Sequence, residues 1–101
     1  MKLYRYTFHT YDTKVELEEL DVEEKAKTYT ILNASWKQRI NKEEVGRISG
    51  YGNNIVILPE KDFEKARVIY LAYLQKKIIE KKESLSSMEK YYKEICDMEA
   101  I

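Results

Sequence analysis

The chain has 101 residues, which allow one domain with a small core, and its 18 basic residues balance its 18 acidic ones. A net charge of zero gives no general attraction to nucleic-acid phosphates or to anionic membranes. The single cysteine, Cys96, excludes a disulfide within the chain and a cysteine-based zinc site, and we expect a cytoplasmic protein.

No segment has the pattern of a membrane span or of a secretory signal. The longest apolar run, Val68 to Leu74, is seven residues long, whereas a membrane helix needs about 20. Residues 1–20 carry charges throughout and lack the apolar core of a signal peptide. We therefore expect no membrane partner and a single domain, with a strand-rich part at 1–58 and a helical part at 60–98.

The beginning of the chain has the alternation of β-strands. In residues 2–11 the side chains of Tyr4, Tyr6 and Phe8 occupy alternate positions, which predicts a strand with one apolar face. Residues 14–23 predict a second strand after a short turn.

The second predicted strand changes its apolar pattern midway. Val15 and Leu17 occupy odd positions, and Leu20 and Val22 occupy even ones. A regular strand points these two pairs to opposite faces. A β-bulge near Glu18–Glu19 would bring all four side chains to one face, and we expect a bulge there.

Three further strands are expected before the helical part. Residues 28–32 and 35–40 have strand character, and Asn41 and Gly46 bracket one predicted helical turn after them. Residues 55–58, IVIL, are apolar at every position. This run predicts a strand inside the sheet that is buried on both faces.

Helical periodicity runs from about residue 60 to residue 98 without glycine or proline. A helix of about 57 Å exceeds the roughly 26 Å width of a domain of this size. We therefore predict an α+β fold, in which a mainly antiparallel five-stranded sheet packs on a long C-terminal helix. A helical hairpin is the alternative, because Ser84–Ser87 weaken the helix and Ser86 with Glu89 matches a capping box.

One stripe of this helix has the 3-4 spacing of a helix-pairing seam, with Lys81 as its one polar break. A second stripe is rotated from it and is expected to cover the sheet; it consists of Phe63, Ala66, Tyr70 and Tyr73. One sheet cannot bury both stripes, so we predict a homo-oligomer, a dimer or higher. The predicted interface consists of Leu71, Leu74, Ile78, Leu85, Met88, Tyr92 and Ile95.

No catalytic constellation and no conventional metal site is evident, so we predict a protein that is not an enzyme and has no cofactor or metal. His9 is the only histidine, and no spacing brings it to Cys96. We expect the acidic residues within 16–24 to form a solvated strand face that resists aggregation. A negative patch for a basic partner is the alternative for these carboxylates.

All three glycines lie between residues 46 and 52. Phosphate-binding loops follow a strand and open a helix, whereas here the glycines precede a strand. We therefore expect a turn that needs positive φ. Tyr51, Asn53 and Asn54 in this turn are the candidate contacts for a ligand or partner.

A second candidate contact surface lies on the helix, where basic side chains follow two tyrosines. Such combinations bind phosphates or bases, although neighbouring glutamates dilute the charge here. The candidate residues are Tyr70, Tyr73, Lys76, Lys77 and Lys81.

Two segments, KTYTILNASWKQRINKEEVGRI and IVILPEKDFEKARVIYLAYLQKKI, together resemble small uncharacterised proteins that phages and prophages of Gram-positive bacteria carry. The resemblance implies accessory proteins that act by binding, including anti-CRISPR proteins and other inhibitors of bacterial defence. In a phage-encoded protein the site of action would be the host cell cytoplasm.

We therefore predict a small non-enzymatic binding protein that acts as an oligomeric inhibitor or sequesterer of a host defence component. Its target would be a host protein or a small nucleotide. The alternative is a nucleic-acid-binding regulator that uses the helix lysines. The salt dependence of target binding would distinguish the two functions. Binding to nucleic acid should weaken steeply as the salt concentration rises, because phosphate contacts release counterions.

Overall fold

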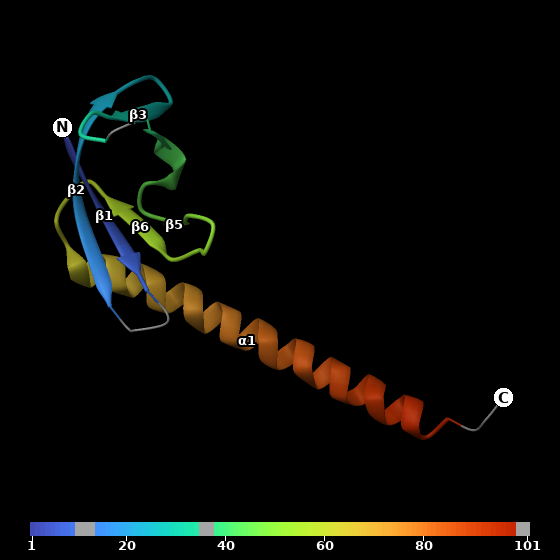
Figure 1. The fold of residues 1–101 in the computed structure, drawn as a ribbon. Helices are drawn as coiled ribbons and strands as arrows, with labels where there is room; N and C mark the ends of the chain where they lie inside the picture. Colours follow the sequence, from blue (N-terminus) through green and yellow to red (C-terminus); the bar gives the residue numbers. More distant parts are fainter. Residues whose placement is uncertain (10–13, 35–37, 99–101) are drawn as a thin grey trace. The chain divides into compact units, whose positions relative to one another are not determined.

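The computed structural model describes residues 1–9, 14–34 and 38–98, and the chain divides into two units, Met1–Leu71 and Ala72–Ile101. The first unit holds a sheet and the beginning of a long helix, and the helix continues through the second unit (Figure 1). The elements are β1 (Lys2–Phe8), β2 (Val15–Glu24), β3 (Thr28–Ile31), β4 (Gln38–Asn41), the 3-10 turn η1 (Lys42–Glu44), β5 (Ile48–Ser49), β6 (Ile55–Leu58) and α1 (Phe63–Cys96). The predicted α+β class, with an antiparallel sheet and one long C-terminal helix, is confirmed.

The sheet has six strands rather than the predicted five, in the order β4-β3-β2-β1-β6-β5. The additional strand is β5, in which Ile48 pairs with Val56 and Ser49 pairs with Ile55. Two residues are too few to show the alternation from which a strand is predicted. The described part of the predicted strand 35–40 is β4, and residues 35–37 lie outside the described residues.

The predicted bulge in β2 is wrong. The β1–β2 register is regular from Lys2 opposite Asp21 to Phe8 opposite Val15. The two apolar pairs of β2 therefore point to opposite faces. Leu20 and Val22 are buried, whereas Val15 and Leu17 remain 40% and 38% exposed. The strand tolerates the change in pattern because each face of the sheet has a core of its own.

The first core lies on the face to which Leu3 and Leu20 point, since directly paired residues of antiparallel strands share a face. Ile57 of β6 is on this face, and β3 and β4 contribute further apolar side chains. The buried members of this core are Leu3, Leu20, Val22, Ile31, Ile40 and Ile57.

The second core lies on the opposite face, where the first turns of α1 cover β1 and β6. Phe8 stacks on Tyr70 with ring centroids 4.3 Å apart, and the Tyr6 and Phe63 rings are 6.2 Å apart. Ala66 is fully buried on the same helix stripe. The prediction that this stripe covers the sheet is thus confirmed for the part of α1 in the first unit.

The strand β6 is buried on both faces, as its sequence predicts. Val56, Ile57 and Leu58 are each at most 3% exposed. The strand lies between β1 and β5, inside the sheet. Its all-apolar sequence therefore contributes to both cores.

Local signals explain where the turn and the helix begin and end. Gly46 follows η1 with φ +81°, and Asn41 precedes η1 but makes no side-chain bond to its backbone. Asp62 caps α1, because its Oδ1 accepts a hydrogen bond of 3.1 Å from the Lys65 backbone N–H.

Ser84–Ser87 are helical, so the chain does not reverse there and the alternative of a helical hairpin is excluded.

The Tyr6 hydroxyl is buried in the second core and makes no hydrogen bond of good geometry with any described residue. Burial raises the pKa of this hydroxyl, while the Asp62 backbone N–H acts in the opposite direction. A buried hydroxyl without a partner costs about 1–3 kcal/mol.

We expect Tyr6→Phe to leave the free energy of unfolding unchanged or to raise it by about 1 kcal/mol at neutral pH. As the pH rises through 10, the unfolded wild type loses the Tyr6 proton first while the folded state keeps it, so wild-type stability falls. Tyr6→Phe should lose less stability over that range. Urea unfolding at pH 8 and above 10 measures both effects, and parallel losses in the two proteins would contradict this role of Tyr6.

Candidate functional site

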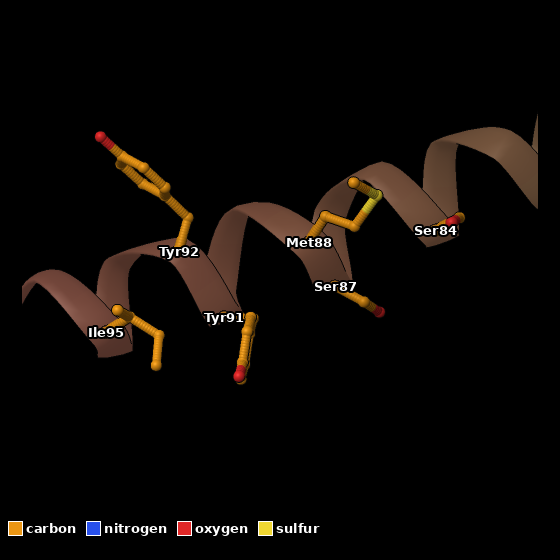
Figure 2. Close-up of a pocket in the computed structure, with 6 residues that line it drawn as sticks. All are labelled: Ser84, Ser87, Met88, Tyr91, Tyr92 and Ile95. Carbon is orange, nitrogen blue, oxygen red and sulfur yellow. The ribbon is translucent and has the colours of Figure 1, made fainter.

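Many exposed apolar side chains lie on α1 in the second unit. All described residues from 75 to 98 are exposed, and the apolar ones among them include Leu85 at 56%, Met88 at 65% and Tyr92 at 73%. A shallow groove on this face is lined by Ser84, Ser87, Met88, Tyr91, Tyr92 and Ile95 (Figure 2). We call this groove and the adjoining Leu85 the apolar helix face.

The apolar helix face has no ionisable side chain apart from the tyrosine hydroxyls, and it offers methyl groups, rings, a thioether and two serine hydroxyls. Such a surface supplies neither a general acid–base pair nor a metal site. It suits contact with another apolar surface, because burial of a large apolar side chain contributes about 1.5–3 kcal/mol.

The structure leaves much of the predicted seam open. Ile78 is 53% exposed and Ile95 is 46% exposed, while Leu74 is half-buried. Leu71 is 52% exposed and belongs to the first unit. The predicted oligomer interface remains a prediction, and these side chains are available for it.

The sequence reasoning missed Ser84, Ser87 and Tyr91, which flank the seam within the groove. The 3-4 spacing identifies only the residues at the centre of a helix-pairing stripe and not the residues beside them. Tyr91 could have been predicted from its position beside the seam, because it lies seven residues after Ser84 and directly before a seam residue.

The glycine-rich segment is the turn of the β5–β6 hairpin. Gly50 and Asn53 have φ of +84° and +51°, and the Asn53 backbone N–H donates to the Gly50 carbonyl over 3.2 Å. A Cβ on Gly50 would lie 2.8 Å from the Ile55 Cδ1 atom. The positive φ favours glycine at position 50, and a Cβ there would also displace the Ile55 side chain, which supports a structural role for the segment.

Asn54 and Tyr51 of this turn differ in their contacts. The Asn54 side chain donates to the Phe8 carbonyl over 3.0 Å, and the Asn54 carbonyl accepts from the Phe8 N–H over 2.8 Å. Asn54 therefore joins the turn to β1. Tyr51 is fully exposed at the tip, and it is the residue of this turn best placed to contact a partner.

We expect Tyr51→Ala to change the free energy of unfolding by less than about 0.5 kcal/mol, because the ring contacts solvent. If Tyr51 contacts the target, this variant will lose binding with its melting temperature unchanged. Thermal unfolding and a binding assay on the same sample separate the two effects. A melting temperature several degrees lower would show that the ring supports the turn.

The basic candidate surface on α1 is only partly assembled. Tyr70 is 9% exposed and stacked on Phe8, so its ring belongs to the core. The Lys77 Nζ lies 5.8 Å from the Tyr73 ring centroid and 3.3 Å from the Glu80 carboxylate. Lys76 and Lys81 are exposed. A glutamate thus offsets one of the three candidate lysines, and the nucleic-acid alternative remains a prediction.

The acidic residues of β2 meet cations of neighbouring segments. Ion pairs of 2.8–3.5 Å join Lys2 to Glu19, Arg5 to Glu18, Lys25 to Glu23 and Lys42 to Glu24. The hydrogen bond from Lys42, together with its charge, lowers the pKa of Glu24. These cations offset the negative charge along the strand, which supports the interpretation of a solvated strand face.

Among residues 1–9, 14–34 and 38–98, no three His, Cys, Asp or Glu side chains gather as a metal site would require. Cys96 is exposed at the end of α1. Within the same described part of the chain, no helix is long and apolar enough to cross a membrane.

Comparisons of the chain with protein-family models, with curated proteins and with solved structures found no match.

Proposed function

We propose that this chain is a non-enzymatic binding protein that acts as an oligomer. Copies are held together by the apolar helix face and the seam residues beside it. The first unit carries the target contact, for which the exposed Tyr51 is the best candidate. The resemblance to phage accessory proteins supports a role as an inhibitor or sequesterer of a host defence component.

One observation carries the proposal: large apolar side chains of the second unit are exposed in a row. Leu85, Met88 and Tyr92 are each more than half exposed, and they repeat at the 3-4 spacing of paired helices. Monomeric proteins rarely expose a contiguous apolar patch of this kind. Pairing would remove these side chains from water.

The test is the oligomeric state of two matched variants. Leu85 lies in the seam and is 56% exposed, whereas Ile79 lies outside the seam and is 50% exposed. Leu85→Lys and Ile79→Lys make the same kind of change in charge and size on the same helix. Because only Leu85 would be buried by pairing, Leu85→Lys should dissociate the oligomer and Ile79→Lys should not.

Sedimentation equilibrium of the full-length protein at high micromolar concentration gives the mass of each sample. A wild type that stays monomeric there would overturn the proposal. Equal dissociation by the two lysine variants would also contradict it, because the interface would then not follow the seam.

A further inference from the structure

We infer that the partner of the seam is a second copy of this chain whose helix runs antiparallel to the first. This inference rests on the oligomer of the proposed function and specifies its geometry. The proposal concerns the helical residues 72–97, whose charges are distributed unevenly along the chain. Charge complementarity between the two copies selects the orientation.

The two halves of this segment carry opposite net charge. Residues 72–82 contain four lysines and one glutamate, a net charge of +3. Residues 83–97 contain four acidic residues and two lysines, a net charge of −2. An antiparallel pair places each positive half beside the negative half of the other copy, whereas an in-register parallel pair places like charges together.

The seam itself disfavours the parallel pair. In that arrangement each seam residue meets its own copy, so Lys81 would face Lys81 of the second copy inside the interface. On the flank, Lys77 would approach Lys82 of the second copy, because flanking residues five positions apart meet across a parallel pair. Both contacts are repulsive.

The antiparallel pair removes these contacts. We choose the register in which the largest number of apolar seam residues face an apolar seam residue of the second copy. This register places Leu74 opposite Tyr92 of the second copy and Ile78 opposite its Met88. Lys81 then faces Leu85 of the second copy, where its aliphatic stem covers the leucine and its ammonium reaches water. No seam residue meets its own copy in this register.

The flank of the antiparallel pair also becomes complementary. Lys82 and Glu89 lie one heptad apart on the same side of the seam. In an antiparallel pair, this side of one helix lies against the same side of the helix of the second copy. Lys82 lies beside the symmetry axis, between Lys82 and Glu89 of the second copy. Helical side chains lean toward their own N-terminus, so Lys82 and Glu89 of the second copy lean toward each other, and the symmetry of the pair makes this contact twice. Neither residue has an ion-pair partner among the described residues of its own chain.

The single, exposed Cys96 provides a direct measurement of the orientation. In the antiparallel register Cys96 lies level with position 70 of the second copy, 26 residues from the other Cys96. This corresponds to about 39 Å along the helix axes. In the parallel pair the two Cys96 residues lie side by side. Pulsed dipolar spectroscopy of the full-length protein, spin-labelled at Cys96, measures this distance.

Charge reversal on the flank gives an independent measurement. Lys82→Glu should weaken the antiparallel dimer about tenfold, because it turns two attractive contacts into repulsive ones. The double variant Lys82→Glu/Glu89→Lys should restore wild-type dimerisation. In a parallel pair Lys82→Glu would instead tighten the dimer, because the introduced carboxylate would then face Lys77 of the second copy.

A distance near 40 Å together with weakening by Lys82→Glu and restoration by the double variant is the expected result. A distance below about 20 Å, or a tighter Lys82→Glu dimer, would overturn the antiparallel pairing while leaving the proposed oligomer intact. A labelled protein without dipolar coupling that sediments as a monomer would overturn the proposed function itself.

Discussion

Replacement of Ile57 by alanine is expected to lower the free energy of unfolding by about 2–5 kcal/mol. Ile57 is 3% exposed and belongs to the first core together with Leu3 and Leu20. It lies in β6, which is hydrogen-bonded to a strand on each side. The loss of its side chain would leave a cavity that these strands cannot close without moving.

The matched control for this variant is Ile79→Ala, because Ile79 is 50% exposed on α1. It should change stability by less than about 0.5 kcal/mol. Urea unfolding at neutral pH compares the two variants. Amide exchange should also show residues 55–58 among the most protected, and exchange there as fast as at the chain ends would contradict the central position of β6.

Truncation after Glu83 is expected to convert the oligomer to a monomer. The deletion removes Leu85, Met88, Tyr92 and Ile95, the outer half of the predicted interface. Since burial of each large side chain contributes about 1.5–3 kcal/mol, the dissociation constant should rise at least about a thousandfold. Sedimentation equilibrium over a concentration series measures this change.

The first unit should remain folded in the truncated protein, because both cores consist of residues within Met1–Leu71. Near-ultraviolet circular dichroism and thermal unfolding provide the control. A truncated protein that is folded and still forms an oligomer with the same number of copies would show that the interface lies outside residues 84–101.

Periodicity alone determined much of the architecture. The alternation in residues 2–8, the all-apolar run of β6 and the helical spacing after Pro59 each identified an element. These elements are predictable because each apolar pattern matches the geometry of one backbone conformation. The turn around Gly50 was predictable for a related reason, since glycine adopts positive φ at little cost.

The candidate site was predictable in part. The seam residues from Ile78 to Ile95 could be chosen from their spacing, and they are exposed in the structure. The sequence placed Tyr70 both in the stripe that covers the sheet and in the basic surface, because an aromatic residue beside lysines suits a core and a binding face equally well. Its stacking on Phe8, 62 residues earlier in the chain, assigned it to the core.

The sequence by itself thus determined the class of the fold, the inner position of β6 and the surplus of apolar surface on α1. Only the tertiary structure decided how β2 uses its two apolar pairs, that Ile48–Ser49 form a sixth strand, and that Ser84–Ser87 continue the helix. The physical reason is that local patterns report which side chains must leave water. The partner against which each apolar side chain packs belongs to a strand or helix distant in the sequence, as the contact between Tyr6 and Phe63 in the second core shows.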